Sequence, residues 1–212
     1  GKFDLSLDEW TEISEGPDSK FVGYDIFRTD SKIRRFSLNG QGQLQFILDI
    51  TPFYAESGGQ VGDQGTLEQN GKKWNVVDVQ KQGDSIIHFC EKKSFEVKNN
   101  SLETSLEYTL DDSPLTAVVD EKLRLSTTNN HTAAHLMHEA LRQVLGEHVN
   151  QAGSFVSPGI LRFDFTHFEK VSEEQMEKIE NIVNAVIRKN IPTDIYETPF
   201  QEAIDSGITA LF

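Results

Sequence analysis

Short runs rich in β-branched and aromatic residues recur through the first half of the chain. Three of these runs, 43–50, 74–80 and 85–90, have the length and composition of β-strands. Turn pairs such as Asn70-Gly71 stand between them. Short strands separated by such turns favour an antiparallel sheet, so we predict a small antiparallel β-barrel over residues 1–112.

The pattern becomes mixed in the second half. The segments predicted there are a strand at 115–119, a helix at about 131–145, a strand at 160–165 and a helix at about 173–189. The second helix is the clearest, because its apolar residues recur at helical spacing and Ser172 with Gln175 forms a capping box at its start. Strands mixed with helices predict an α+β domain over residues 113–212.

Composition and net charge limit the kinds of molecule that this chain can bind. The 212 residues carry a formal net charge of −14, which disfavours tight binding of nucleic acid by this chain alone. Local cations could still guide one end of an RNA, and the candidates are Lys32, Arg34, Arg35, Arg142 and Arg162. No segment has the pattern of a membrane span or a signal peptide, so we expect a cytoplasmic protein with no membrane partner. The single cysteine, Cys90, follows an apolar run and is predicted to be buried and structural.

Three of the six histidines fall within eight residues of the first predicted helix. His131 and His135 are four residues apart, so both side chains can reach one zinc ion from one helix face. His138 lies roughly 10 Å further along the axis, too far for the same ion. Thr132 occupies the place where a zinc peptidase needs a glutamate base, which excludes that class. The spacing therefore indicates half of a zinc site, or two histidines on a half-exposed helix face.

A second unusual segment, 51–65, places four glycines within eight residues after a predicted strand. One interpretation is a loop that needs several positive φ angles. The other is close approach of the backbone to a ligand. A phosphate-binding loop is excluded, because no lysine follows the glycines at the required position.

These two segments, together with 151–154, 161–168 and 210–212, resemble the editing region of alanyl-tRNA synthetases in order and in spacing. The resemblance covers the chain from about Phe21 onward. It implies a barrel followed by an α+β editing domain of the threonyl/alanyl-tRNA synthetase type. The implied activity is hydrolysis of the ester that joins serine or glycine to tRNA(Ala), with the tRNA acceptor end and the rest of the synthetase as partners.

The resemblance also implies roles for individual residues. His131 and His135 would be zinc ligands, Thr132 would recognise the serine hydroxyl, and Gln151 would line the pocket beside the reacting group. The aminoacyl end would lie near Gly58, Gly59, Gln60 and Asp164, and the resemblance leaves the role of Glu56 open.

The sequence departs from the family in one respect. The other two zinc ligands of the family belong to a Cys-Gly-Gly-Thr-His motif, which this sequence lacks, so we expect a C-terminally truncated editing region. The ATP- and magnesium-dependent ligation of alanine would belong to a catalytic domain that is absent here. Two alternatives stay open: a free-standing trans-editing protein, and a module that docks tRNA or a neighbouring domain without chemistry.

Overall fold

The computed structural model describes residues 9–39, 42–91, 110–193 and 198–206. Contacts within the chain divide it into two units. The first comprises Gly1–Thr128 with Val156–Ile160, and the second comprises Asn129–Phe155 with Leu161–Phe212. Each unit is described by itself.

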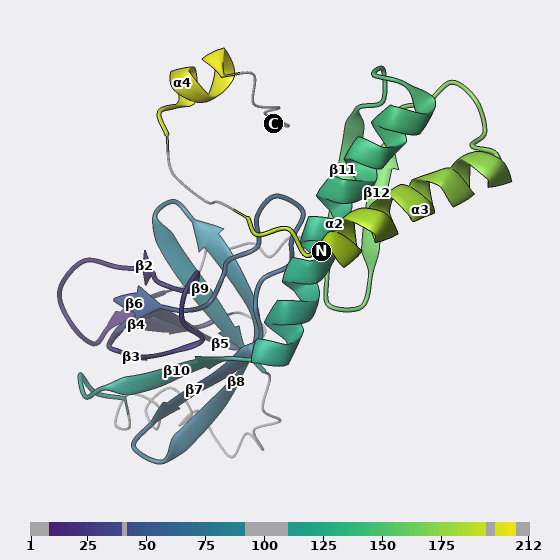
Figure 1. The fold of residues 1–212 in the computed structure, drawn as a ribbon. Helices are drawn as coiled ribbons and strands as arrows, with labels where there is room; N and C mark the ends of the chain where they lie inside the picture. The colour runs from purple at the N-terminus through teal and green to yellow at the C-terminus, as the bar shows by residue number, and fades with distance from the viewer. Residues whose placement is uncertain (1–8, 40–41, 92–109, 194–197, 207–212) are drawn as a thin grey trace. The chain divides into compact units, whose positions relative to one another are not determined.

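Eight strands of the first unit form one sheet in which all neighbours are antiparallel, in the order β1-β4-β5-β9-β8-β7-β10-β3 (Figure 1). Their bounds are β1 Thr11–Glu12, β3 Arg28–Ser31, β4 Ile33–Leu38, β5 Leu44–Leu48, β7 Gly65–Gln69, β8 Lys72–Gln82, β9 Ser85–Cys90 and β10 Leu115–Val119. Two further strands, β2 (Lys20–Phe21) and β6 (Ile50–Thr51), pair in parallel. The strands predicted at 43–50, 74–80 and 85–90 correspond to β5 with β6, to β8 and to β9.

The predicted barrel is not closed. The sheet curls around one apolar core, but among the described strands no ladder joins β1 to β3, so two edges remain. Strand β1 contributes only two residues, too few to continue the ladder around the core. Strand β10, which the sequence analysis counted with the C-terminal part, pairs with β7 on one side and β3 on the other. It therefore belongs to this sheet.

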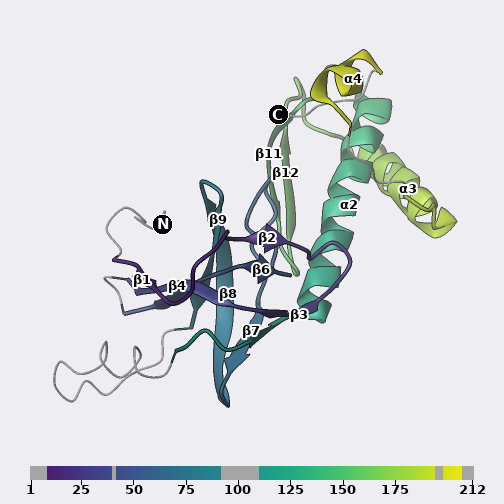
Figure 2. The ribbon, with the colours of Figure 1, turned by 90° about the vertical axis from the view of Figure 1, so that its left-hand side faces the viewer.

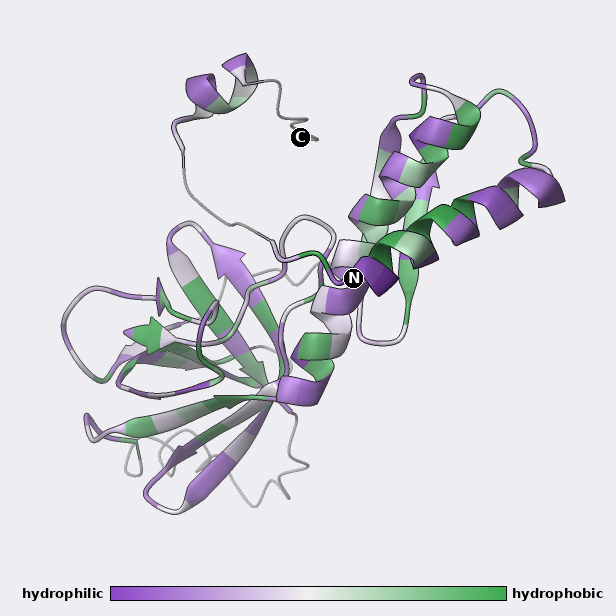
Figure 3. Ribbon diagram, in the orientation of Figure 1, coloured by the Kyte–Doolittle hydropathy of each residue, from purple (hydrophilic) through white to green (hydrophobic). Residues whose placement is uncertain are grey.

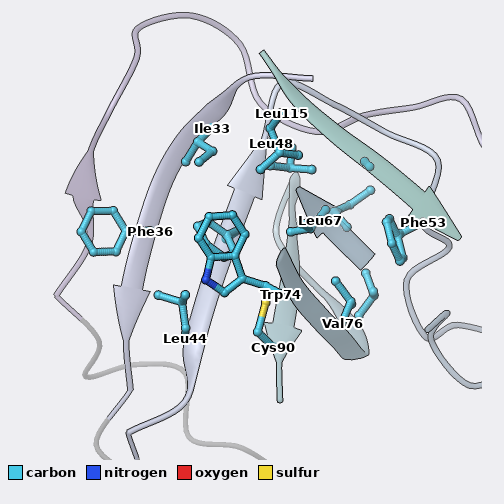
Figure 4. Packing of buried hydrophobic residues seen from close by; sticks show 14 of the residues in the cluster. Ile33, Phe36, Leu44, Leu48, Phe53, Leu67, Trp74, Val76, Cys90 and Leu115 are labelled. Atoms are coloured by element: carbon cyan, nitrogen blue, oxygen red, sulfur yellow. The ribbon is translucent and has the colours of Figure 1, made fainter. Parts of the chain in front are cut away.

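The core of the first unit is filled by side chains from six strands, by Phe53 in the loop after β6 and by Leu110 before β10 (Figure 4). The largest of them, including Phe46, Phe53 and Leu67, are fully buried. Cys90 is 1% exposed and packs in the same cluster, which confirms the prediction of a buried cysteine. Sheet formation here follows from alternation, because the inward residues of β10 are apolar and the residues between them are partly exposed.

Helix α2 (Glu121–Leu145) begins ten residues before the predicted start and crosses from the first unit into the second. Asp120 caps it, since the backbone N–H of Leu123 donates to its side chain at 3.0 Å. The hydroxyls of Thr127 and Thr128 bond to carbonyls of the preceding turn, which satisfies them inside the helix. Thr132 therefore lies in the interior of the helix.

In the second unit, the C-terminal half of α2 packs with a hairpin of β11 (Gln151–Val156) and β12 (Leu161–Phe165) and with α3 (Glu173–Lys189) (Figure 2). Helix α3 begins and ends as predicted, and its capping box between Ser172 and Gln175 is present. Hydrophobic and hydrophilic residues alternate along α3 at helical spacing (Figure 3), and Ile179 is its buried residue. A short helix, α4 (Phe200–Asp205), follows. Within the described part of the chain, no helix is long and apolar enough to cross a membrane.

Candidate functional site

The histidine pair predicted from spacing is formed on α2. The rings of His131 and His135 are stacked, with centroids 5.2 Å apart and an interplanar angle of 10°. His131 is half-buried and His135 is exposed. Burial lowers the pKa of His131, and the positive charge of a protonated His135 lowers it further. Both effects favour the neutral imidazole, which is the form that can bind a metal.

A third metal ligand is missing from the part of the chain that the structure describes, because no group of three histidine, cysteine, aspartate or glutamate side chains gathers there. His138 does not join the pair. It is 6% exposed, donates from Nε2 to the carbonyl of Val149 at 3.5 Å, and packs against Phe163 with ring centroids 5.3 Å apart. His138 thus contributes to the core of the second unit.

The other predicted residues of the second unit lie on α2 and on the hairpin. Thr132 is exposed directly after His131. Gln151 opens β11, is half-buried, and donates from Nε2 to the Ser154 hydroxyl at 3.2 Å. Asp164 of β12 forms an ion pair with Arg162 at 3.2 Å, and its Oδ2 is 3.1 Å from the position of a Cβ at Gly153. A side chain at Gly153 would therefore push the Asp164 carboxylate aside.

The glycine-rich loop belongs to the first unit, and its conformation explains the two adjacent glycines. Ser57 and Gln60 exchange backbone hydrogen bonds of 3.1 and 2.9 Å across Gly58 and Gly59. Both glycines have positive φ, 59° and 82°, as a tight turn of the primed type requires. Gly58 is exposed and has open space at its Cβ position, whereas the Gly59 carbonyl accepts from the Val156 N–H at 2.8 Å. Two of the four glycines thus have the positive φ angles that the loop interpretation requires, and the exposed Gly58 faces solvent.

A buried ion pair that the sequence analysis missed fixes this loop. Arg124, in the first turn of α2, forms an ion pair with Asp63; the side chains are 7% and 5% exposed. The same guanidinium donates to the carbonyls of Pro52 at 2.9 Å and Gly23 at 2.6 Å. The Asp63 carboxylate also accepts from the Tyr54 N–H at 2.7 Å. One arginine therefore binds both ends of the segment that carries Gly58 and Gly59.

Glu56, in the same loop, is exposed and accepts from the Gln80 amide at 2.8 Å, which gives it a partner on β8.

Two of the three local cations of the first unit, Lys32, Arg34 and Arg35, form ion pairs. Arg34 pairs with Asp49 at 3.8 Å, and Arg35 pairs with Asp18. These two arginines are therefore partly neutralised, which weakens the expectation that they guide an RNA.

The predicted site residues fall into two groups. Gly58, Gly59 and Gln60 lie in the first unit. The second group, His131, Thr132, His135, Gln151 and Asp164, lies in the second unit. Within the second unit, His131 and His135 are in contact. Each group is considered within its own unit. The segment 210–212, which continued the resemblance, lies outside the described residues.

Comparison with known proteins gives consistent matches. The family of class II (A) tRNA synthetases matches residues 4–107. Alanine–tRNA ligase of Cytophaga hutchinsonii is 44% identical over 98% of this chain, which spans 23% of that protein. Alanine–tRNA ligase of Chlorobaculum tepidum is 44% identical over 100% of this chain and 24% of the protein. The corresponding enzyme of Carboxydothermus hydrogenoformans is 45% identical over 91% of this chain and 22% of the protein. The chain thus spans about a quarter of the length of these curated relatives.

Proposed function

Since this chain belongs to the alanine–tRNA ligase family along nearly its whole length, we propose that it is part of an editing region that hydrolyses mischarged tRNA. The substrates are tRNA(Ala) carrying serine or glycine in place of alanine. The observation that carries the proposal is the stacked pair of His131 and His135, with the exposed hydroxyl of Thr132 between them in sequence. The relatives are named as ligases, and the ligase reaction itself is assigned to parts of the protein outside this chain.

The histidine pair fits half of a zinc site. Two imidazoles one helical turn apart match two ligands of a tetrahedral ion, and the lowered pKa of His131 favours its metal-binding form. The other two ligands are proposed to come from residues that this sequence does not contain. Bound zinc would supply a positive charge at the ester, either to polarise a water molecule or to hold the substrate amino group.

The residues beside the pair are proposed to select the substrate. A synthetic site rejects an amino acid with one extra hydroxyl only weakly, so a second site that binds the hydroxyl is needed to remove errors. Thr132 is assigned that contact, because it carries a hydroxyl and is an exposed residue of the helix that carries the pair. Gln151 offers an amide for orienting the ester, and its present partner, Ser154, is a neutral hydroxyl that can be exchanged for substrate.

The glycine turn and Asp164 are proposed to contact the aminoacyl end. The solvent-facing side of Gly58 leaves room for a ligand close to the backbone. Gln60 is 5% exposed, so its contribution would be to hold the turn. Asp164 already pairs with Arg162, and it would accept a hydrogen bond while keeping that partner. A cytoplasmic location, the acceptor end of tRNA(Ala) as partner, and ATP with magnesium in the ligase reaction belong to the same proposal.

The test is hydrolysis of serine-charged tRNA(Ala) by this chain and by a longer chain extended through the Cys-Gly-Gly-Thr-His motif, with zinc measured in both. We expect the longer chain to bind about one zinc and to hydrolyse the ester, and the 212-residue chain to do both poorly, because two ligands hold zinc weakly. His131→Ala in the longer chain should abolish zinc binding and hydrolysis together. His138→Ala is the control, since that ring faces the core, and it should keep the zinc.

One observation favours a second candidate for the chain by itself. Among the described residues the metal ligands stop at two, which suits a module that docks tRNA without chemistry. If neither chain hydrolyses the ester while both bind the tRNA, this candidate replaces the editing proposal. A free-standing editing enzyme would instead require full activity from the 212-residue chain.

A further inference from the structure

Three aromatic rings of the second unit form a small surface stack at the open end of the β11–β12 hairpin. The imidazoles of His148 and His167 are joined by a hydrogen bond of 2.9 Å between Nε2 and Nδ1, and their centroids are 5.1 Å apart. Phe168 stacks on His148 with centroids 4.8 Å apart and an interplanar angle of 26°. Neither histidine belongs to the proposed zinc pair. The stack is therefore a separate feature of this unit.

Contacts with Gly146 and Asn150 fix the position of the stack in the second unit. A Cβ at Gly146 would meet the His148 ring at 2.9 Å, so this ring packs directly on the end of α2. The carbonyl of His148 accepts from the Asn150 side chain at 3.0 Å, and the Thr166 N–H donates to the Asn150 carbonyl at 3.0 Å. These bonds join the segments 146–150 and 166–168, which fixes His148 and Phe168 relative to each other.

Phe168 is nevertheless 87% exposed, the highest value among the exposed large hydrophobic residues described. One face of its ring is stacked on His148, while most of its surface meets solvent. Its neighbours in sequence, Thr166, Glu169 and Lys170, are polar and exposed, so this segment presents a single apolar ring. A protein interface needs a broad apolar patch at its centre, whereas a single planar ligand needs only one supported ring.

We propose that Phe168, supported by His148, is a stacking site for one unpaired nucleobase of an RNA strand. This inference rests on the proposed function and deepens it, because it assigns a contact to the single-stranded end of the substrate. Stacking suits an acidic chain, since a base can stack on an aromatic ring without a cluster of cations. Arg142, in the last turn of α2, forms no ion pair with a described residue and supplies one positive charge at the same end of the helix.

A second exposed aromatic residue provides a matched control. Tyr24 is 82% exposed in the first unit, but it meets Phe21 edge to face, with centroids 5.0 Å apart and an interplanar angle of 81°. It therefore matches Phe168 in exposure and ring type and differs in its support. Replacing Tyr24 should leave RNA binding unchanged.

The experiment uses the 212-residue chain and an RNA hairpin with a single-stranded ACCA end in which the last adenine is 2-aminopurine. Anisotropy gives the Kd, and quenching of the aminopurine reports stacking of that base. We expect Phe168→Ala to raise the Kd about tenfold and to remove the quenching. Phe168→Trp should retain both, whereas Phe168→Leu, which keeps apolar volume without a ring, should behave like Phe168→Ala. Circular dichroism verifies that each variant is folded.

The outcomes separate this inference from the proposed function. Equal Kd values for the unchanged chain and Phe168→Ala overturn the stacking site, and the editing proposal then still depends on the hydrolysis assay. Full affinity of Phe168→Leu also overturns it, because the contact would then be apolar, as for a protein partner. No binding of the hairpin at millimolar protein overturns it as well. If the longer chain does not hydrolyse the ester while the quenching by the 212-residue chain is intact, the editing chemistry is rejected and the stacking site remains.

Discussion

The two units differ in the size of their hydrophobic cores and in the burial of their polar groups. The described core of the first unit contains sixteen buried hydrophobic residues in one cluster, whereas the cluster of the second unit has four, Ala140, Leu141, Val149 and Ile179. The first unit also buries an ion pair, Arg124 with Asp63. In the second unit, most polar groups assigned to chemistry lie on a half-exposed surface.

This difference suggests a division of roles. A large core with paired buried charges resists local opening, while a small core leaves its helices and hairpin easier to displace. The histidine pair and the ring stack both lie in the unit with the small core. Both tryptophans, Trp10 and Trp74, lie in the first unit, so their fluorescence reports its unfolding, while helical circular dichroism reports mainly the second.

The largest effect is expected from Arg124→Met. It leaves the Asp63 carboxylate buried without its cation and frees the carbonyls of Pro52 and Gly23. The free energy of unfolding of the first unit should fall by about 3–5 kcal/mol. Urea unfolding followed by tryptophan fluorescence measures this change. Arg162→Met, which breaks the exposed pair with Asp164, should change stability by about 1 kcal/mol or less.

A loss below about 1 kcal/mol for Arg124→Met would show that the buried ion pair contributes little to stability. Such a result is known where both partners of a buried ion pair are replaced by well-packed apolar residues. The contrast between buried, paired charges in the first unit and exposed polar groups in the second would then not explain a difference in stability between the units.

The next effect concerns pH and His88. This ring is fully buried in the first unit; Nδ1 donates to the Phe46 carbonyl at 3.0 Å, and Nε2 accepts from the Thr51 hydroxyl at 2.7 Å. Burial lowers its pKa to about 4, against 6.5 for the ordinary group. The unfolded chain therefore takes up this proton first as the pH falls. Stability from this group is complete above pH 6.5 and is lost toward pH 4, by about 3 kcal/mol in total.

The measurement is the free energy of unfolding at pH 7 and pH 4, by tryptophan fluorescence, for the unchanged chain and His88→Gln. The variant should be less stable at pH 7 but should lose about 3 kcal/mol less on acidification, because glutamine does not titrate. Identical pH profiles for the two chains would contradict a neutral buried His88.

The elements predicted well from sequence are those whose signals are local. The strands β9 and β10 begin and end where their β-rich runs place them, and α3 does so where helical spacing and the Ser172 cap place it. The N-terminal part of α2 was missed, because the polar segment 126–130 has weak helix propensity by itself. In the structure, the local Asp120 cap and the buried Arg124 stabilise the helix there, and the contacts of Arg124 with Asp63 and Pro52 are tertiary.

In the candidate site, too, the local feature was predictable. The spacing of four residues places His131 and His135 on one helix face, and their rings stack there. The ion pair of Arg124 with Asp63 was not predictable, because 61 residues separate them and Arg124 lies outside the segments that carry the resemblance. The open sheet was missed for a related reason, since closure depends on the length of β1 and not on the turn signals.

A smaller effect is expected in the second unit from His138→Ala. The substitution removes a buried ring that packs on Phe163, and the free energy of unfolding should fall by about 2 kcal/mol. Helical circular dichroism during urea unfolding measures it. Glu139→Ala, at the exposed neighbouring position, is the control and should have little effect. An unchanged transition for His138→Ala would mean that this ring is not part of the core.

The smallest effect is expected from Ser172→Ala, which removes the cap of α3. Its side chain accepts from the Gln175 N–H at 3.2 Å, and the Gln175 side chain in turn accepts from the Ser172 N–H at 2.8 Å. Loss of such a cap lowers helix stability by about 1 kcal/mol. Lys178→Gln, which breaks the exposed pair with Glu174 on the same helix, should have a smaller effect. Because α3 lies wholly in the second unit, the change should appear in the circular dichroism and leave the tryptophan transition in place. If both signals shift equally, the two units unfold as one, and the small core of the second unit is stabilised by the first.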